Sequence, residues 1–478
     1  MTRALVYGFG IAGKAVARAL LKRRYEVVAV DDDVSGDKLQ VSGELGIELI
    51  DAPDAERIEE LVRWSDLVVP APGIPETHPV IVGAIANIRP LRTEIDLAYE
   101  WEQQRPNGPR PMLAVTGTDG KTTTTLLATE MLEAAGIHAL AVGNTELPLV
   151  EALDDDSAHA FVVECTSFRL SWTTCFRPDA AVWLNLAPDH LNWHTDIDSY
   201  CAAKARIWMY QDSEDVAIGF ADDPIVMAHL RTARARHVTF ALRDADYHCT
   251  VNTNAGATLM GPNGPLCAVA AMRRALPHDL TNALAAAALV QQSGLADEAA
   301  IVQALRTFVG PPHRIEQIGE AHGVRWYNDS KATTPHAALT AIRAFDSLVL
   351  IAGGRNKDLD LAGLGSEPRR MRGVVAIGEA ADLIAEVFAG VCPVVRASSM
   401  SAAVEQAASL ARRGDAVVLS PACASFDWYP EGGYPARGDD FRTLVLQHLE
   451  GQQLVPVELV LVPTSFNFGR QTYGEITH

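Results

Sequence analysis

Residues 116–122 read Thr-Gly-Thr-Asp-Gly-Lys-Thr, and this glycine-rich segment stands between a strand pattern, MLAV, and a helix pattern, TTTLLATEMLEAAG. Glycines in such a turn let backbone N–H groups converge on phosphate oxygens, and the N-terminus of the following helix favours negative charge. Lys121 can neutralise phosphate charge and Thr122 can ligate Mg²⁺. The segment is not a strict Walker A sequence, because Val115 stands where the first glycine is expected. A turn that merely caps a helix is the alternative, but Gly-Lys-Thr between a strand and a helix favours a phosphate site in an α/β fold.

The rest of the chain also alternates strand and helix patterns. Near the N-terminus, ALVYGFG, a helical stretch and YEVVAVDDD form a βαβ pattern. A polar, proline-bearing stretch at 102–111 is typical of a linker, and VGPPHR at 309–314 marks a second break. After it, SLVLIAGG, GVVAIG and AVVLSPA are strand patterns separated by helical stretches, as in a doubly wound parallel sheet. We therefore predict an α/β protein with three domains and a tail of unassigned role, at 1–98, 106–308, 309–450 and 451–478.

Composition narrows the classes of function. The net charge is −20 and no run of Lys and Arg occurs, which argues against a nucleic-acid partner. The seven cysteines are odd in number and include no Cys-x-x-Cys pair, so neither a disulfide framework nor a structural zinc site is expected. The first residues read as strand, turn and helix rather than as a signal peptide, and no apolar run reaches about 18 residues. We expect a cytoplasmic monomer that spans no membrane.

Three segments downstream of the phosphate loop carry candidate metal-site residues. Glu164 ends the apolar strand pattern AFVVE, where a carboxylate suits Mg²⁺, although a solvent-facing strand end explains it equally well. Asp189 and His190 form a pair of a kind that is more often structural than catalytic. Lys204, in YCAAKARIW, reads on spacing alone as an ordinary surface lysine of a helix. Taken singly, none of these residues identifies a site.

Together with the phosphate loop, these segments resemble the Mur ligase family. TGTDGKTT resembles the TGTNGKTT loop of Mur ligases and folylpolyglutamate synthetases, with Asp119 in place of the usual Asn. VVECTSFRL, LNLAPDHLNWH and YCAAKARIW resemble the patterns E-x-S-S-F-Q-L, L-N-x-x-x-D-H and Y-x-x-A-K. LPHDLTNALAAAA resembles H-N-x-x-N-A-L-A-A, with Asn282 retained and Asp279 in place of Asn. The resemblance extends over about residues 1–450 and implies an N-terminal Rossmann-like domain, a central P-loop ATPase-like domain with a parallel sheet, and a C-terminal Rossmann-like domain.

Motifs in the third α/β segment extend the resemblance. PPHR, NDSKAT and GGRNKDLDL resemble the family motifs P-H-R, N-D-S-K-A-T-N and G-G-x-x-K-x-x-D-[FL]. LSPACASFD resembles the S-P-A-x-A-S-F-D motif of the branch that adds D-glutamate. The D-N-P-R motif of the branch that adds diaminopimelate or lysine does not occur. Downstream, Tyr434 and Arg437 match an aromatic residue and the arginine of F-x-x-R-G.

A second glycine-rich segment, Gly8-Phe9-Gly10-Ile11-Ala12-Gly13, opens a helix pattern, and Asp31 ends the next strand pattern. Alone, this is a dinucleotide fingerprint that supports an NAD-dependent dehydrogenase, although any anionic ligand can use the same turn and helix end. The family resemblance instead implies that this element binds the uridine diphosphate of a substrate. APGIP, with Gly73, and GNTELP, with Asn144, resemble the family loops S-P-G-[IV] and G-N-[IT]-G at the same substrate.

The resemblance implies a role for each matched residue. The implied catalytic residues are Lys121, His190, Lys204 and Lys331. ATP would contact Gly117, Thr118, Asp119, Gly120, Lys121, Thr122, Thr123, Asn282, Arg314 and Asp329. Two Mg²⁺ ions would be held by Thr122, Glu164, His190 and Lys204, the last as a carbamylated lysine. The UDP-linked substrate would contact Ile11, Ala12, Asp31, Gly73, Asn144 and His190, and D-glutamate would contact Thr333, Lys357, Ser425 and Tyr434.

The reaction that the resemblance implies joins D-glutamate to UDP-N-acetylmuramoyl-L-alanine with ATP and Mg²⁺, in the synthesis of peptidoglycan precursors. The alanyl carboxylate would attack the γ-phosphate to form an acyl phosphate, and the amine of D-glutamate would then attack its carbonyl. Another amino-acid-adding Mur ligase and the dehydrogenase are the alternatives. A regulatory protein that keeps the fold without turnover is a further one, since Asp119 and Asp279 depart from the family patterns.

Overall fold

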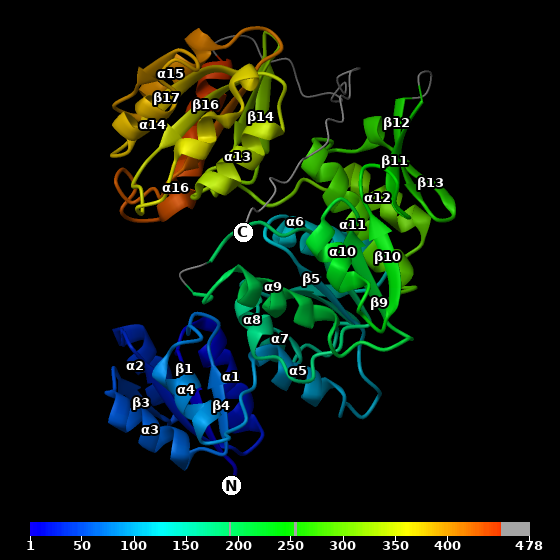
Figure 1. Ribbon diagram of the computed structural model, residues 1–478, viewed down its shortest axis with the longest axis vertical. Coiled ribbons are helices and arrows are strands. Elements are labelled where there is room, and N and C mark those ends of the chain that lie inside the picture. Colours follow the sequence, from blue (N-terminus) through cyan, green and yellow to red (C-terminus); the bar gives the residue numbers. More distant parts are fainter. Residues whose placement is uncertain (191–192, 253–255, 451–478) are drawn as a thin grey trace. The chain divides into compact units, whose positions relative to one another are not determined.

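The computed structural model describes residues 1–190, 193–252 and 256–450, in which strands and helices alternate along most of the chain (Figure 1). The first sheet has the strand order β3-β2-β1-β4 and is parallel throughout. Its elements are β1 (Arg3–Tyr7), α1 (Ile11–Lys22), β2 (Glu26–Asp31), α2 (Gly36–Leu45), β3 (Glu48–Asp51), α3 (Ala55–Trp64), β4 (Leu67–Pro70) and α4 (Pro79–Ala86). Strands β1, β2 and β4 are buried along nearly their whole length, as is typical of parallel strands covered on both faces.

Two glycines let α1 begin directly beside the end of β1. A Cβ atom on Gly13 would lie 1.9 Å from the carbonyl oxygen of Gly8, and Gly8 itself has a φ of 93°. A side chain at either position would therefore displace the helix or strain the turn. Asp31 closes the same edge of the sheet, because its Oδ2 atom accepts a hydrogen bond of 2.5 Å from the backbone N–H of Phe9.

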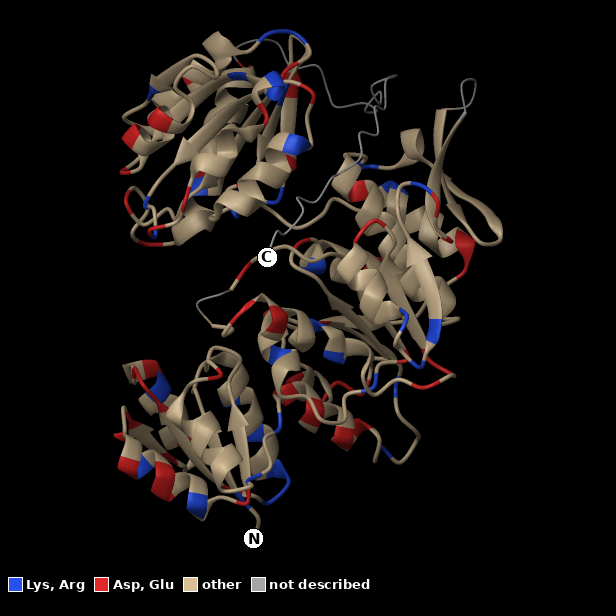
Figure 2. Ribbon diagram, viewed as in Figure 1, with Lys and Arg blue, Asp and Glu red and all other residues tan. Residues whose placement is uncertain are grey.

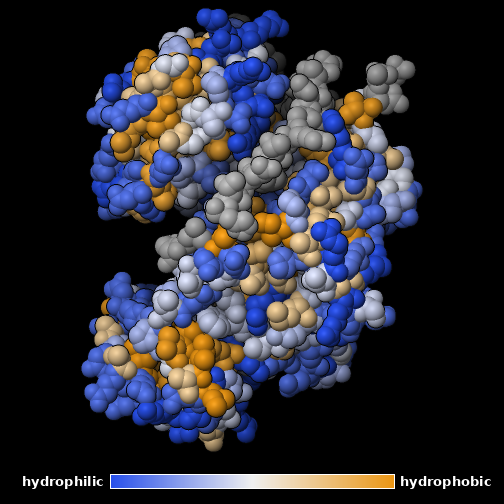
Figure 3. All heavy atoms as spheres, viewed as in Figure 1, coloured by the Kyte–Doolittle hydropathy of each residue, from blue (hydrophilic) through white to orange (hydrophobic). Residues whose placement is uncertain are grey.

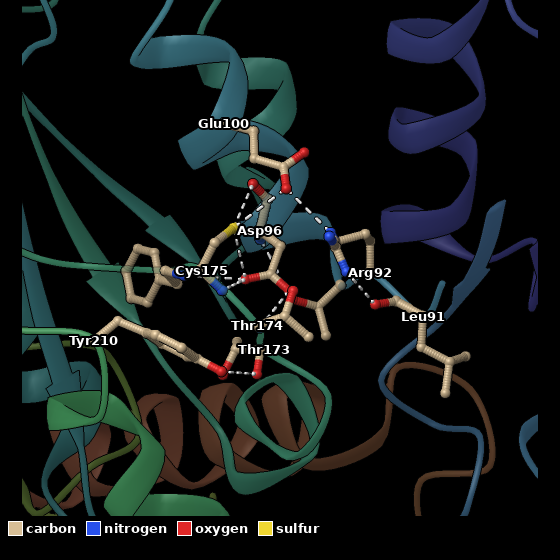
Figure 4. Close-up of polar contacts among 10 residues, drawn as sticks. Leu91, Arg92, Asp96, Glu100, Thr173, Thr174, Cys175 and Tyr210 are labelled. Carbon is tan, nitrogen blue, oxygen red and sulfur yellow. Dashed lines mark hydrogen bonds and ion pairs between the residues drawn. The ribbon is translucent and has the colours of Figure 1, made fainter. Parts of the chain in front are cut away.

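Helix α5 (Glu94–Glu102) follows the first sheet, and its buried carboxylates bind residues beside the second sheet (Figure 4). Asp96 is fully buried and accepts hydrogen bonds from the backbone N–H groups of Thr174, at 2.9 Å, and Cys175, at 3.3 Å. The other two buried carboxylates form ion pairs, Glu94 with Arg169 at 2.5 Å and Glu102 with Arg110 at 2.8 Å. The first predicted domain boundary, at residue 98, falls inside this helix.

The second sheet is built from six parallel strands in the order β10-β9-β8-β5-β7-β6. Its strands are β5 (Met112–Thr116), β6 (Ala139–Gly143), β7 (Ala160–Glu164), β8 (Ala180–Trp183), β9 (Val216–Phe220) and β10 (Arg236–Phe240). The helices around it are α6 (Lys121–Ala134), α7 (Leu149–Ala152), α8 (Ser167–Ser171), α9 (Ile197–Ala205), η1 (Arg206–Trp208), α10 (Pro224–Leu230), α11 (Pro277–Gln292) and α12 (Glu298–Thr307). Because β8, β5 and β7 are neighbours and parallel, the loops at their carboxyl ends meet at one edge.

A small antiparallel sheet and a third large sheet complete the described fold. The small sheet consists of β11 (His248–Asn252), β12 (Gly256–Gly261) and β13 (Gly264–Ala268), followed by η2 (Val269–Ala271). The third large sheet has the order β14-β15-β19-β16-β17-β18, and only its edge strand β14 is antiparallel to its neighbour. Its strands are β14 (Glu316–Ala321), β15 (Val324–Asn328), β16 (Leu348–Gly353), β17 (Met371–Ile377), β18 (Val394–Arg396) and β19 (Ala416–Ala422). Its helices are α13 (Pro335–Arg343), η3 (Ala362–Ser366), η4 (Pro368–Arg370), α14 (Ala381–Val387), α15 (Met400–Leu410) and α16 (Gly433–Glu450).

The described chain divides into two compact units, one of residues 1–272 with 279–308 and one of residues 273–278 with 309–450. The first unit holds the first and second sheets, and the second unit holds the third large sheet. The predicted α/β fold class with parallel sheets is confirmed. The three predicted domain ranges stay predictions, and the predicted tail lies outside the described residues.

The surface carries charges of both signs, which Figure 2 shows interspersed over the described segments. Figure 3 shows apolar atoms over α4, and Val82, Ile85 and Ile88 are exposed on this helix or just after it. No helix in the described part of the chain is both long and apolar enough to cross a membrane.

Candidate active site

The phosphate loop connects β5 to α6 and depends on its two glycines. Gly117 has a φ of 155° and Gly120 a φ of 82°, both in the region that favours glycine. A Cβ atom on Gly117 would lie 2.9 Å from the Cβ atom of Leu184, and one on Gly120 would lie 2.5 Å from Oδ1 of Asn282. The loop is therefore packed tightly against its neighbours and holds its backbone in a defined shape.

Asn185, just after β8, clamps this loop. Its Oδ1 atom accepts hydrogen bonds of 2.9 Å from the backbone N–H groups of both Thr118 and Asp119, and its Nδ2 atom donates to the carbonyl oxygen of Asp119 at 3.2 Å. Sequence reasoning did not assign a role to Asn185, although it is the Asn of the L-N-x-x-x-D-H pattern. The hydroxyl of Thr118 lies 3.0 Å from that of Tyr200, which is the Tyr of the Y-x-x-A-K pattern and was also unassigned.

Two lysine side chains meet at the phosphate loop. Lys121 donates hydrogen bonds to the carbonyl oxygens of Gly117, at 2.9 Å, and Thr118, at 2.8 Å. Lys204, on α9, donates a hydrogen bond of 2.7 Å to the same oxygen of Gly117 and is only 1% exposed. Burial, together with the charge of Lys121, holds the pKa of Lys204 well below its usual range. The reading of Lys204 as an ordinary surface lysine is thus wrong, and the lowered pKa favours the neutral amine, which is the nucleophilic form.

Glu164 ends β7 beside the phosphate loop and is 2% exposed. Its Oε1 atom accepts a hydrogen bond of 3.0 Å from Nδ2 of Asn144, while its buried Oε2 atom has no hydrogen-bond partner among the described residues. The alternative of a solvent-facing Glu is therefore wrong. A buried carboxylate oxygen without a donor is costly in a protein interior unless a cation or a ligand occupies the space in front of it.

His190 lies in the loop between β8 and α9, in a left-handed conformation with a φ of 56°. Its ring packs against that of Phe168, with 4.6 Å between centroids, and its Nε2 atom lies 3.3 Å from Oδ2 of Asp189. Burial lowers the pKa of His190, and the positive charges of Lys121 and Lys204 lower it further, against the opposing effect of Asp189. The neutral ring is the form of His that can ligate a metal ion.

The side chains around the phosphate loop supply only some of the ligands that a Mg²⁺ ion needs. In the described residues, no three side chains of His, Cys, Asp or Glu lie close enough together to hold a metal ion. The unpartnered Oε2 atom of Glu164 nevertheless supplies one oxygen ligand of the kind that Mg²⁺ prefers, and Thr122 lies in the first turn of α6 at the same loop. Phosphate oxygens and waters usually complete such a site, so the residues present fit a nucleotide-bound Mg²⁺.

Asn282, on α11, lies against the phosphate loop. Its Oδ1 atom accepts a hydrogen bond of 3.4 Å from the hydroxyl of Thr124. The residue is buried in the first unit, with 8% of its surface exposed. Asp279 begins the same buried face and is 6% exposed. The position at the loop agrees with a role near the nucleotide, while the predicted contact with adenine stays a prediction.

Most residues predicted to bind the UDP moiety lie at the carboxyl ends of the strands of the first sheet. Ile11 and Ala12 begin α1, where Ile11 is 67% exposed, and Gly73 is exposed in the loop after β4. Asp31 is 8% exposed and is already bonded to Phe9 and, at 2.7 Å, to Lys38. Asp31 therefore shapes this edge, whereas the N-terminus of α1 is open to an anionic ligand. Asn144 lies apart from this edge, after β6 and against Glu164.

In the second unit, Asp329 is buried at the end of β15. It accepts hydrogen bonds from the hydroxyl of Ser420, at 2.7 Å, and from the backbone N–H of Ile315, at 3.2 Å. Burial raises the pKa of Asp329 to about 7. Its neighbour Arg314 follows the left-handed His313, in the turn that Asp329 helps to close.

Among the residues predicted to bind the amino acid, the structure brings Thr333 and Tyr434 to Lys331. The Nζ atom of Lys331 lies 5.3 Å above the ring of Tyr434, and the backbone N–H of Thr333 donates to the carbonyl oxygen of Lys331 at 2.9 Å. Ser425 is 2% exposed and lies in the loop after β19. Lys357 is exposed in the loop after β16, and its role stays a prediction.

Arg437 has a structural position that its motif did not reveal. It is 1% exposed, and its guanidinium donates to the hydroxyl and carbonyl oxygens of Ser330 at 2.9 and 2.8 Å, and to the carbonyl oxygen of Cys423 at 3.2 Å. Arg437 thus ties the loop that carries Lys331 to the loop that carries Ser425. The match to the arginine of F-x-x-R-G singles out Arg437 in the sequence, but it does not predict which residues Arg437 contacts.

Comparisons with known proteins identify the family. A model described as "Mur ligase middle domain" matches residues 115–290, and one described as "Mur ligase, glutamate ligase domain" matches residues 313–423. A UDP-N-acetylmuramoylalanine–D-glutamate ligase of Frankia casuarinae is 40% identical over 460 residues, covering 92% of this chain and 93% of that protein. The chain belongs to the Mur ligase family. A protein of the same name from Pelotomaculum thermopropionicum is 36% identical over 463 residues, covering 94% of this chain and 98% of that protein.

Solved structures of Mur ligases share the fold. MurF ligase from Thermotoga maritima, in complex with ADP, has a TM-score of 0.57 at 16% identity and covers 94% of this Mur ligase and 95% of its own chain. UDP-N-acetylmuramate-alanine ligase MurC from Thermotoga maritima has a TM-score of 0.55 at 18% identity, with coverage of 94% and 100%. Membership of the family also favours a ligase over the NAD-dependent dehydrogenase that the N-terminal glycines alone would allow.

Proposed function

We propose that this Mur ligase joins D-glutamate to UDP-N-acetylmuramoyl-L-alanine at the expense of ATP, in the synthesis of peptidoglycan precursors. The observation that carries the proposal is the match over nearly the whole chain, at 40% identity, to a protein named for that reaction. The S-P-A-x-A-S-F-D motif around the buried Ser425 supports D-glutamate as the added amino acid. ATP and UDP-linked sugars are cytoplasmic metabolites, so we place the reaction in the cytoplasm.

The first step activates the substrate carboxylate. An oxygen of the alanyl carboxylate attacks the γ-phosphorus of ATP, the bond to the β-phosphate oxygen breaks, and ADP leaves behind an acyl phosphate. The two reactants are both anions, so positive charge at the phosphate loop lowers the barrier. Lys121 supplies this charge once its amine turns from the carbonyl oxygens of Gly117 and Thr118 to the phosphates.

The second step forms the amide bond. The amine of D-glutamate attacks the acyl carbonyl, the resulting tetrahedral intermediate loses inorganic phosphate, and the amine gives up one proton. Lys331 is the cation that we assign to the phosphate or to the incoming amino acid, and Thr333 and Ser425 supply hydroxyls for its carboxylates. Arg437 keeps the two loops that carry these residues in one arrangement.

Metal binding is assigned to Thr122, Glu164 and His190, with Lys204 as a carbamate. A bound Mg²⁺ would neutralise phosphate charge and orient the transferred group. Lys204 fits carbamylation because its burial favours the neutral amine, which is the form that adds CO₂, and the product is an anion that a lysine otherwise cannot provide. Two metal sites and the monomeric state stay predictions.

A phosphate-release assay with purified protein, ATP, Mg²⁺ and UDP-N-acetylmuramoyl-L-alanine tests the proposal. The amino acids to compare are D-glutamate, L-glutamate, D-aspartate, L-alanine and meso-diaminopimelate. We expect release with D-glutamate and formation of the dipeptidyl nucleotide, detected by mass spectrometry. Release with a different amino acid alone would reassign the substrate, and binding of the nucleotides without any release would favour the regulatory alternative.

A further inference from the structure

His194 is a buried histidine to which the family resemblance assigns no role, because it ends the segment LNLAPDHLNWH beyond the matched pattern L-N-x-x-x-D-H. It lies between β8 and α9, and its side chain has no exposed area. Both ring nitrogens have partners. Nδ1 lies 3.2 Å from Oε1 of Glu76, and Nε2 lies 2.9 Å from the hydroxyl of Ser167. Because a carboxylate only accepts hydrogen bonds, the ring donates from Nδ1 to Glu76 and accepts from Ser167.

The two partners of His194 lie beside different sheets of the first unit. Glu76 lies in the loop after β4 of the first sheet, three residues after Gly73, and its side chain is 21% exposed. Ser167 begins α8 beside the second sheet, three residues after Glu164, and is 1% exposed. The hydroxyl of Thr195 adds a second, longer contact of 3.5 Å to the other carboxylate oxygen of Glu76.

The ring of His194 is also fixed on its faces. It stacks on Phe168 with 5.8 Å between centroids and lies 5.2 Å from the ring of Tyr200, whose hydroxyl meets Thr118 of the phosphate loop. The backbone N–H of His194 donates to the carbonyl oxygen of His190 at 3.0 Å. A ring held in this way has a single orientation, so its Nδ1–H points at Glu76 as a fixed donor.

We propose that His194 is a positioning residue that, through Glu76, holds the loop of residues 71–78 in the arrangement that binds the UDP-linked substrate. This inference rests on the proposed function, because the nucleotide substrate is assigned to the first sheet by that function. It assigns to His194 no contact with substrate and no proton transfer. Its effect is the placement of a substrate loop relative to Ser167 and to the phosphate loop.

The experiment combines steady-state kinetics with a double-mutant cycle of Glu76→Ala and His194→Phe. Phenylalanine keeps a flat ring between Phe168 and Tyr200 and removes only the hydrogen bonds. We expect each variant to raise the KM for the UDP-linked substrate about 10-fold, with kcat and the KM for ATP changed less than about threefold. The double variant should be no worse than either single one, because both changes break the same contact.

Two further variants separate the roles of the two ring nitrogens. In His194→Asn the amide nitrogen replaces the Nδ1 donor, and this variant should keep a KM near that of the parent protein. In His194→Gln the amide reaches instead toward Ser167, and this variant should behave like His194→Phe. The matched control is His138→Phe with Glu133→Ala, which removes an exposed His–carboxylate contact of 2.8 Å elsewhere in the same unit and should leave all constants unchanged.

Hydrogen–deuterium exchange gives a second readout that needs no turnover. Peptides that cover residues 71–78 should exchange faster in Glu76→Ala and in His194→Phe than in the parent protein or in the His138→Phe control. Additive effects in the cycle, a loss confined to kcat, or unchanged exchange in this loop would overturn the positioning role. Absence of turnover by the parent protein would contradict the proposed function instead. The exchange result would still decide the role of His194. If His194→Phe fails to fold, Glu76→Ala and His194→Gln carry the same comparison.

Discussion

The amine of Lys204 and the carbonyl oxygen of Gly117 are joined by a hydrogen bond of 2.7 Å, across 87 residues of sequence. This contact connects helix α9 to the phosphate loop and buries an amine in the centre of the candidate site. Burial and the nearby Lys121 hold the pKa of Lys204 well below its usual range, which favours the neutral, nucleophilic form of the amine. The chemistry assigned to the site therefore depends on a residue that looks ordinary in the sequence.

Replacement of Lys204 by alanine should abolish ligation, because it removes the side chain to which the carbamate is assigned. Excess bicarbonate should not restore activity, whereas a small carboxylic acid that fills the space should restore part of it. The carbamate itself can be checked independently by ¹³C NMR of the protein in labelled bicarbonate, where one signal should be absent from Lys204→Ala. Parent-like rates in this variant would show that the carbamate assignment is wrong.

Replacement of Lys121 by alanine should lower phosphate release by at least about 100-fold, since a preorganised charge at the phosphates is lost. The melting temperature should change little, because Lys121 is only partly buried and its two acceptors are backbone carbonyl oxygens. Lys22→Ala, on the exposed end of α1, is the control for a lost lysine and should keep full activity. A Lys121→Ala enzyme with normal turnover would remove the phosphate loop from the mechanism.

Replacement of Asp119 by asparagine should lower the KM for ATP by about two- to fivefold, because one negative charge near the phosphates is removed. The clamp by Asn185 uses the backbone of Asp119, so the shape of the loop should be preserved. Initial rates at varied ATP concentration measure the effect. A higher KM would mean that the carboxylate takes part in binding, for example through a cation.

Stability should depend on pH through Asp329, whose pKa burial raises to about 7. A carboxyl group with a raised pKa binds its proton more tightly in the folded state than in the unfolded state. Its contribution to the free energy of unfolding is therefore complete below about pH 4 and is lost as the pH rises toward about 7. Asp329→Asn should flatten this fall and should be more stable than the parent protein at about pH 8 in urea unfolding. Asp346→Asn, an exposed carboxylate of the same unit, should leave the fall in place.

Removal of the Asp96 carboxylate should destabilise the first unit. Asp96→Ala leaves the backbone N–H groups of Thr174 and Cys175 without their acceptor in a buried place, which costs about 2–4 kcal/mol. Glu100→Gln, on the partly exposed side of the same helix, should change the free energy of unfolding by less than about 0.5 kcal/mol. Chemical denaturation of both variants tests the difference, and equal effects would contradict it.

The fold class and the phosphate loop could be predicted because their signals are local. Alternating strand and helix patterns, the glycines at 117 and 120, and Lys121 lie within short windows, and the structure places them in the predicted order. The positions of Glu164 and Lys204 could be predicted only through the resemblance, because their burial depends on partners far along the chain. Isolated spacing favoured a surface lysine for Lys204, and the packing of α9 against the phosphate loop decided otherwise.

Other parts of the site gave no local signal. Asn185 contacts Asp119 across 66 residues, and His194 contacts Glu76 across 118 residues, so neither pair shares a pattern that a single sequence could reveal. Arg437 was visible as a motif residue, but its three bonds to Ser330 and Cys423 come from tertiary packing. Long-range hydrogen bonds of this kind are specified by the whole fold rather than by neighbouring residues.

The buried carboxylates of α5 also bear on how the first sheet could be exchanged. Because Glu94, Asp96 and Glu102 hold this helix beside the second sheet, a recombinant fragment that starts after Glu102 would leave Arg169 and Arg110 without their carboxylate partners. A graft of a foreign nucleotide-binding sheet should instead be spliced before Thr93, the residue that caps α5. A junction before α5 keeps the ion pairs of this helix with Arg169 and Arg110, whereas a junction behind the helix removes them.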